Sequence, residues 1–330
     1  MARKLRLEYA GACYHVINRG NNRQSIFGGQ GSAEAFERCL DQTCRRTGWR
    51  VQAYVIMRNH FHLAVETPEP NLSVGMKWLQ GTWANRFNRY RGQVGRPFQG
   101  RYKALHVEPG HALAQVAHYI HLNPARAKVV PAARLGDFRW SSLWWLGRKD
   151  RPAWLAPETV LAAAGGLADT KAGWQRYIDY LGVLAEEDPR ERDKLYGRLS
   201  RGWAVGTKGF RQELVRNLRQ GNASLAKAAR RGEGLGERRQ LREEIWGERL
   251  EVAAQAAGLD LGQLGPRKSD ARKVLLAAVL KASTDVSNGW LSARLHMGTP
   301  ASASQFVRRF HQRGGTKDPR YQRALSRLET

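Results

Sequence analysis

The sequence predicts an α+β fold followed by an all-α C-terminal region. In residues 1–145, short apolar segments that alternate as strands do are interleaved with segments whose apolar residues recur every three or four positions, as on helices. Between about residue 153 and residue 313, only the helical spacing recurs. A chain of 330 residues, 42% of them hydrophobic, is long enough to bury more than one core. We therefore expect more than one domain.

The first strand and the first helix are predicted between residues 13 and 44. Cys13–Asn18 alternates and predicts a strand, and the polar residues 19–22 that follow it predict a turn. Ser32 can cap a helix. The apolar stripe of this helix has spacings of three and four and comprises Phe36, Cys39, Leu40, Thr43 and Cys44.

A strand pair and a long helix follow. Trp49–Met57 predicts a second strand, which bends at residues 58–59 and continues to Val65, before Pro68 and Pro70 stop it. The next helix is amphipathic, with apolar residues three or four positions apart at Leu72, Met76, Leu79, Trp83, Phe87 and Tyr90.

A strand and a helix complete the first half. Arg96–Val107 predicts the strand, and the helix is expected from about His111 to Asn123, where Pro124 ends it. The order strand, helix, strand pair, helix, strand, helix favours an antiparallel sheet of ferredoxin-like type with its helices on one face.

Two histidines on one strand face form the first candidate site. Because side chains alternate along a strand, His60 and His62 share one face, while Phe61, Leu63 and Val65 share the other. An imidazole pair can bind a divalent ion, which then requires a third protein ligand and a substrate. The triplet is short, and it also fits two hydrogen-bonded histidines that bind no metal.

A tyrosine and an asparagine form the second candidate site. Tyr119 and Asn123 lie four residues apart on the predicted helix and therefore point the same way. A deprotonated phenol can attack phosphorus, and an amide oxygen is a suitable ligand for Mg²⁺ or Mn²⁺. The same pair also fits a tyrosine packed in the core and an asparagine that caps the helix end.

The charge of the chain indicates a polyanionic partner. The sequence has 55 Lys and Arg against 29 Asp and Glu, a formal net charge of +26, which favours nucleic acid. A membrane partner is not expected, because no apolar run approaches the ~20 residues that span a bilayer and Met1–Arg6 leads into no signal-peptide core. We expect a cytoplasmic protein associated with the nucleoid. Its three cysteines fit neither a disulfide framework nor a zinc ribbon, so any metal ligands are His and oxygen groups.

Four spaced motifs occupy the first 145 residues. They are YHVINRG at 14–20, MRNHFHL at 57–63, FQGRY at 98–102 and YIHLNPARA at 119–127, and Trp140-Ser141-Ser142 follows them. Their combination and order resemble the single-tyrosine HUH transposases, and within them the branch of REP-associated tyrosine transposases.

The resemblance implies an enzyme with an HUH nuclease domain. Members of this family cut single-stranded DNA beside hairpins, form a covalent 5′-phosphotyrosine and leave a free 3′-hydroxyl without using ATP. The resemblance implies Tyr119 as the nucleophile, and His60, His62 and Asn123 as the ligands of Mg²⁺ or Mn²⁺. It thus implies a metal-dependent endonuclease and strand-transferase that acts on hairpin DNA in transposition.

Basic and polar residues near these motifs are candidate DNA contacts. They precede the first strand, follow it in the predicted turn, or lie before the catalytic helix. The candidates are Arg3, Lys4, Arg6, Arg19, Asn21, Arg23, Arg101 and Lys103. Each of them alone also fits a solvated surface residue.

Residues 270–313 predict a second DNA-binding site. Helical spacing over Asp270–Lys281, a helix from Trp290 to Leu295 that Ser287 caps, a turn and the basic helix Ala301–Arg313 form a helix-turn-helix pattern. The residues expected to face the groove are Ser302, Ser304, Gln305, Arg308 and Arg309.

The turn at the start of that basic helix carries a second resemblance. Gly298-Thr299-Pro300 and the Ser-rich helix start are similar to the DNA-binding domain of the bacterial replication initiator DnaA, which some members of the transposase branch append. A helical bundle that completes the fold is the alternative.

Three domains are expected. Charged residues, Gly and Pro at 146–152 break the alternating pattern and predict a boundary. The nuclease domain is expected at 1–145, a basic helical connector region at 146–265 and the helix-turn-helix domain at 266–330.

Two functions other than transposition stay open. One is a non-catalytic DNA-binding regulator, and the other is a rolling-circle-type replication initiator with the same chemistry. Such initiators and relaxases typically have an extra His or a second Tyr, and neither is found here at a matching spacing. The expected partners are single-stranded and hairpin DNA with flanking duplex, bound by a monomer or a homodimer.

Overall fold

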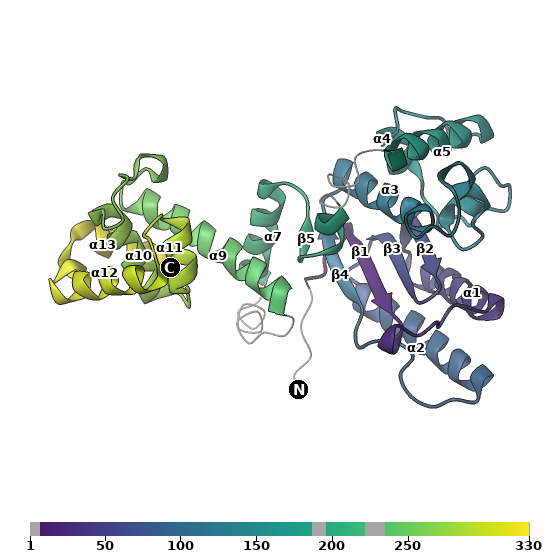
Figure 1. Cartoon of the computed structure of the whole chain (residues 1–330), viewed down its shortest axis with the longest axis horizontal. Coiled ribbons are helices and arrows are strands. Elements are labelled where there is room, and N and C mark those ends of the chain that lie inside the picture. The colour runs from purple at the N-terminus through teal and green to yellow at the C-terminus, as the bar shows by residue number, and fades with distance from the viewer. Residues whose placement is uncertain (1–6, 187–195, 222–234, 330) are drawn as a thin grey trace. The chain divides into compact units, whose positions relative to one another are not determined.

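The computed structural model of the chain describes residues 7–186, 196–221 and 235–329. It divides into two compact units, Met1–Arg211 and Gln212–Thr330 (Figure 1). Among the described residues, the first unit contains the sheet and the second consists of helices. The predicted α+β fold with an all-α C-terminal region is thereby confirmed. The functional domain limits at 1–145, 146–265 and 266–330 stay a prediction.

The sheet of the first unit has the strand order β2-β3-β1-β4-β5. The strands are β1 (Ala12–Arg19), β2 (Arg50–Met57), β3 (His60–Thr67), β4 (Lys103–Val107) and β5 (Ala204–Val205). The pairs formed among the first four strands are antiparallel, as expected. β5 pairs with β4 in parallel, so the complete sheet is mixed.

Helices cover both faces of this sheet, so the prediction of helices on one face is wrong. α1 (Gln30–Thr47) and α2 (Leu72–Arg91) pack on the face of Phe61 and Leu63. α3 (His111–Arg126) packs on the other face, together with α4 (Glu158–Ala163) and α5 (Lys171–Glu186) (Figure 1). The physical reason is that the strands have apolar residues on both faces, and each apolar face requires a cover.

Several elements differ from those predicted. The strand expected to bend at residues 58–59 is two antiparallel strands, β2 and β3, because the chain reverses there. The strand expected from Arg96 begins only at Lys103, because Gly100 has a φ of 69° that extended backbone does not adopt. α3 continues past Pro124 to Arg126. The proline removes only one N–H donor, and the remaining residues of the last turn keep their helical conformation. α1 starts at Gln30 after the N-cap Gly29, and Ser32 lies within its first turn.

A buried polar network holds α3 against its neighbours. The hydroxyl of Tyr177 on α5 lies 2.8 Å from His118 Nδ1 and 2.9 Å from His121 Nδ1. His121 Nε2 lies 2.7 Å from the hydroxyl of Ser142, which accepts a hydrogen bond from the backbone N–H of Tyr54 on β2. Because buried polar groups are costly unless they are paired, this network restricts how α3 can shift along the sheet.

The second unit is built from helices around one apolar core. They are α9 (Leu235–Ala256), α10 (Ala271–Ser283), α11 (Asn288–Arg294), α12 (Pro300–Gln312) and α13 (Pro319–Glu329). α7 (Lys208–Gly221) spans the limit between the two units. Short 3-10 segments complete the chain at Asn21–Arg23, Ala132–Asp137, Ser142–Trp145, Leu261–Gln263 and Gly315–Lys317.

The helices expected over residues 270–313 are present in this unit. Ser287 caps α11 through the backbone N–H of Trp290, as expected, and Thr299 caps α12. Whether they form a DNA-binding helix-turn-helix stays a prediction. None of the described helices combines the length and the apolar character that a membrane span requires.

Two glycines of α2 provide a test of how this helix packs against Trp49. A Cβ at Gly75 would lie 2.2 Å from the ring of the buried Trp49, whereas a Cβ at exposed Gly81 would have nothing within 4 Å. We expect Gly75→Ala to destabilise the fold by about 1–3 kcal/mol through overpacking. Gly81→Ala should stabilise it by about 0.5–1 kcal/mol through helix propensity. Urea denaturation of both variants measures the two effects, and equal shifts would contradict the packing described for Trp49.

Candidate active site

Three histidines share the sheet face that α3 covers. β1 and β3 pair with His15 opposite Ala64 and Ile17 opposite His62, so His15 and His62 are diagonal neighbours on one face. Their ring centroids are 5.1 Å apart, and those of His60 and His62 are 5.2 Å apart. His15 and His62 are buried and His60 is half-buried. The sequence prediction included His60 and His62 but gave His15 no role.

α3 places Tyr119 and Asn123 over these histidines. The ring of Tyr119 lies 5.4 Å from that of His62 and 5.7 Å from that of His15, measured between centroids. The Asn123 side chain is hydrogen-bonded to His60, and its Nδ2 lies 3.5 Å from the backbone oxygen of Tyr119. The structure therefore brings together the four residues of the two candidate sites.

Hydrogen bonds determine which nitrogen of His60 carries the proton. His60 Nδ1 lies 2.7 Å from Asn59 Oδ1, and Asn59 Nδ2 donates to the backbone oxygen of Arg23 at 3.1 Å. The second bond orients the amide, so Asn59 Oδ1 is the acceptor and His60 Nδ1–H the donor. Burial lowers the pKa of His60 to about 4, with a further contribution from Arg19, so the ring is neutral at pH 7. Its Nε2 then carries a lone pair.

The contact between His60 and Asn123 fits a metal ligand pair. The contact with Asn123 raises the pKa of His60 against the larger, opposite effect of burial. A neutral imidazole has one N–H, and Asn59 already accepts it. The Asn123 amide thus lies beside His60, whose Nε2 lone pair is left for a ligand role.

His62 supplies the remaining nitrogen of this donor set. Burial holds the pKa of His62 well below its usual value, and the neighbouring His15 and His60 add to the effect. No group of three His, Cys, Asp or Glu side chains suited to a metal occurs among the described residues. Two imidazoles and the neutral amide oxygen of Asn123 nevertheless fit Mg²⁺ or Mn²⁺, which accept oxygen and imidazole ligands.

Basic side chains surround the histidines. After burial, Arg19 contributes to the low pKa values of His60 and His62, and Lys103 contributes to that of His15. Arg126, at the end of α3, is exposed and lies with its Cζ 5.2 Å from the centroid of the Tyr119 ring. Such an arrangement favours an anion beside Tyr119.

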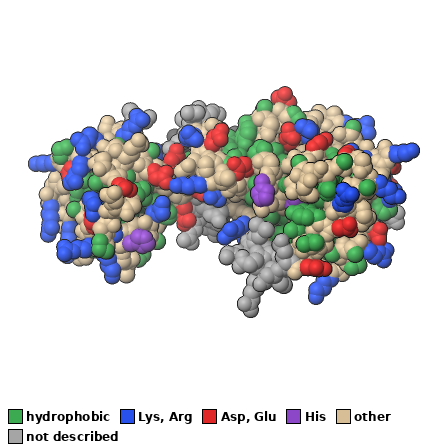
Figure 2. Space-filling view, turned by 90° about the horizontal axis from the view of Figure 1, so that it is seen from above, with side chains coloured by type: hydrophobic (Ala, Val, Ile, Leu, Met, Phe, Trp, Pro, Cys, Tyr) green, Lys and Arg blue, Asp and Glu red, His purple; other side chains and the backbone are tan. Residues whose placement is uncertain are grey.

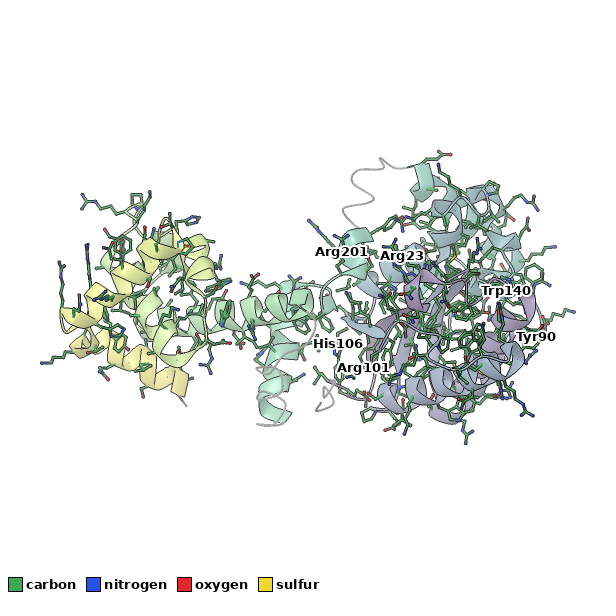
Figure 3. The ribbon with its side chains drawn as sticks, turned by 60° about the horizontal axis from the view of Figure 1, so that its bottom comes forward. Arg23, Tyr90, Arg101, His106, Trp140 and Arg201 are labelled. Carbon is green, nitrogen blue, oxygen red and sulfur yellow. The ribbon has the colours of Figure 1, made fainter. Side chains whose placement is uncertain are left out.

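The other predicted DNA contacts lie in several places. Asn21, Arg23 and Arg101 are exposed on the first unit (Arg23 and Arg101 are labelled in Figure 3). Arg3, Lys4 and Arg6 lie outside the described residues. The candidates of the second unit are on α12, where Ser304, Gln305, Arg308 and Arg309 are exposed and Ser302 is half-buried.

Sequence reasoning missed three side chains and one backbone group. His15 and Arg126 occur in the quoted motifs, and strand alternation would have placed His15 on a face, although not beside His62. Tyr196 is buried, with its ring centroid 5.2 Å from that of Tyr119 and 4.3 Å from Arg126 Cζ. The backbone oxygen of Leu199 lies 2.8 Å from His15 Nδ1. No sequence pattern marked residues 196–199.

Part of the first unit matches a family of transposases. Residues 9–123 match the family model described as "Transposase IS200 like". Over these residues the chain is therefore similar to the IS200-like transposases. The matched segment contains His15, His60, His62 and Tyr119 and ends at Asn123, whereas α5 and residues 196–205 lie beyond it. The predicted transposase resemblance is thereby confirmed.

Similar solved structures include a REP-associated tyrosine transposase bound to a REP hairpin. That chain is 16% identical, and the alignment covers 47% of the present chain and 90% of the other with a TM-score of 0.38. No curated protein matches the chain.

Proposed function

We propose that this chain is a metal-dependent single-stranded DNA endonuclease and strand-transferase that acts at hairpin DNA in transposition. The observation that carries the proposal is the position of Tyr119, packed against His62 and one helical turn before Asn123. A nucleophile and a metal ligand set thus meet at one place on the sheet. The transposase family of residues 9–123 supports the same reaction class.

Cleavage in this site is a transesterification. The hydroxyl oxygen of Tyr119 forms a bond to phosphorus as the bond between phosphorus and the 3′ oxygen breaks, and the DNA 5′ phosphate stays on the tyrosine. The phenol proton is lost to solvent and the leaving 3′ oxygen takes up a proton, which gives a free 3′-hydroxyl. Attack by another 3′-hydroxyl reverses these steps and joins two strands. No ATP is needed, because one phosphodiester replaces another.

The neighbouring residues hold the phosphate and offset its charge. His60 Nε2, His62 Nε2 and the Asn123 side-chain oxygen would hold Mg²⁺ or Mn²⁺. When bound, the ion would polarise the scissile phosphate and offset the charge that develops on it. Arg19, Lys103 and Arg126 would bind the phosphates on either side, as phosphate contacts usually position DNA without reading its sequence.

A second candidate function is that of a rolling-circle-type initiator with two tyrosines. It is favoured by Tyr196, whose ring lies beside that of Tyr119. The guanidinium of Arg126 contacts both rings. If Tyr196 were a second nucleophile, one site could hold two covalent strands. A non-catalytic regulator has less support, since the complete set of His60, His62, Tyr119 and Asn123 is present.

We further propose that α12 of the second unit binds duplex DNA beside the hairpin. Its exposed side includes Ser304, Gln305, Arg308 and Arg309, while Ala303 and Val307 are buried in the core. Lys and Arg side chains are spread over the visible surface of both units (Figure 2). A basic helix of this kind can read base edges in the major groove, which a metal site cannot.

The nucleophile can be identified by single-atom substitutions. We expect Tyr119→Phe to abolish the covalent adduct with single-stranded DNA in the presence of Mn²⁺, because the ring remains and the attacking oxygen is lost. Tyr90→Phe is the matched control, since Tyr90 is 84% exposed on α2. Denaturing gels detect the adduct. An undiminished adduct with Tyr119→Phe, together with its loss in Tyr196→Phe, would replace Tyr119 by Tyr196 as the nucleophile.

The ligand set can be tested by titrating Mn²⁺ against the cleavage rate. His60→Ala and His62→Ala should abolish cleavage but retain DNA binding, because affinity comes mostly from phosphate neutralisation. Asn123→Ala should raise the half-saturating Mn²⁺ concentration less severely, because water can replace a neutral amide oxygen. His111→Ala is the control, since His111 is exposed at the start of α3. An unchanged half-saturating Mn²⁺ concentration in His60→Ala, His62→Ala and Asn123→Ala would exclude this ligand set.

The role of α12 can be tested with the full chain. We expect the double change Arg308→Ala and Arg309→Ala to weaken binding to hairpin DNA with flanking duplex, and to reduce the salt slope by about one for each lost phosphate contact. Cleavage of a short single strand should be unaffected. Arg320→Ala is the control, because Arg320 already pairs with Asp318 at 2.7 Å. Fluorescence anisotropy over a salt series measures both quantities, and an unchanged slope in the double variant would leave α12 as part of a helical bundle only.

A further inference from the structure

A continuous hydrogen-bond chain leads into the active site from outside the segment matched by the transposase family. It begins at the backbone oxygen of Leu199, which lies 2.8 Å from His15 Nδ1. It continues from His15 Nε2 to His62 Nδ1 over 2.9 Å. Leu199 lies far beyond the end of the matched segment at residue 123. Residues well separated in sequence thus act on a proposed metal ligand.

The Leu199 carbonyl determines which atoms donate and which accept in this series of hydrogen bonds. A backbone carbonyl can only accept, so His15 Nδ1 carries the proton and donates it to Leu199. His15 is fully buried between this carbonyl and another imidazole, with no carboxylate among its hydrogen-bond partners in the described part of the chain, and a charged ring is costly in such surroundings. Neutral His15 then accepts at Nε2. The donor in the second bond is therefore His62 Nδ1–H, which leaves the Nε2 lone pair of His62 for a ligand role.

The Leu199 carbonyl is held in place by the residues that follow it, which include β5 at the edge of the sheet. The backbone N–H of His106 donates to the oxygen of Trp203 at 2.9 Å, and that of Glu108 donates to the oxygen of Val205 at 2.9 Å. The Glu108 carboxylate in turn accepts the backbone N–H of Thr207 at 2.6 Å. These bonds secure the residues directly after Leu199 to β4. The carbonyl that orients His15 is thus tied to the same sheet as His15 itself.

We propose that His15 is a positioning residue that holds His62 in the Nδ1–H tautomer, and that residues 196–205 belong to the active site. The inference rests on the proposed function for its metal, since His62 Nε2 is the atom that would bind it. Metal-binding histidines commonly donate their other ring N–H to a fixed acceptor, and this second partner orients the ring and raises its basicity. Here the acceptor is an imidazole, whose own proton is fixed by the Leu199 carbonyl.

The tautomer can be measured directly in the metal-free, full-length protein. Long-range ¹H–¹⁵N correlation spectra distinguish Nδ1–H from Nε2–H imidazoles, and spectra of His15→Phe and His62→Ala assign the two signals. We expect both His15 and His62 as Nδ1–H tautomers in the wild-type protein. An Nε2–H tautomer at His62 would overturn the proposal. This result does not depend on cleavage, so it stands even if Tyr119 is not the nucleophile.

Metal binding supplies a second, independent measurement. Mn²⁺ affinity measured without DNA should fall about 10- to 100-fold in His15→Phe, which retains an apolar ring of similar size but no acceptor. His15→Gln should recover much of this loss, because its amide oxygen lies near the position of His15 Nε2. His106→Phe is the control, as His106 packs on Tyr14 at the other face of the sheet. Equal affinities in the wild-type, His15→Phe and His15→Gln proteins would contradict the proposal. If His15→Phe does not fold, the wild-type tautomer and the affinity of His15→Gln decide.

Discussion

The pairing register between β1 and β3 is the constraint on which the rest of the site depends. With Ile17 opposite His62 and Arg19 opposite His60, the residues His15, Arg19, His60 and His62 all project from one sheet face. A shift by one residue would move the histidines of one strand to the opposite face, because side chains alternate along a strand. The register is itself stabilised by the other face, where Tyr14, Val16, Phe61 and Leu63 are buried beneath α1 and α2. Burial of one face thus determines the chemistry of the other.

The position of α3 is the second constraint, because it carries both Tyr119 and Asn123. Apolar contacts alone would hold a helix on a sheet without fixing its position along its own axis. The polar network through Tyr177, His118, His121 and Ser142 adds directional bonds that are satisfied at one position only. Tyr177 lies beyond the segment matched by the family model, so chain outside that segment helps to hold α3.

The sequence predicted local features well and long-range contacts poorly. The spacing of His60 and His62 on a strand, and of Tyr119 and Asn123 on a helix, follows from periods that few residues define. The approach of these two pairs, and of His15 to His62, depends on register and helix placement, which no local pattern encodes. β5 was missed because two residues, Ala204 and Val205, have no detectable period and pair with residues about a hundred positions earlier. The helix from His111 was predicted, but its place on the histidine face of the sheet was not, because apolar spacing defines a helix without indicating which sheet face it covers.

The central claim is that Tyr119 becomes esterified to the 5′ phosphate of a cleaved strand. Peptide mapping by mass spectrometry tests it most directly. The wild-type protein would be incubated with Mn²⁺ and hairpin DNA, then digested with nuclease and protease. The account predicts a nucleotide mass on the peptide that contains Tyr119, attached through the 5′ phosphate. A nucleotide on the peptide of Tyr196 alone, or attachment through the 3′ phosphate, would contradict it.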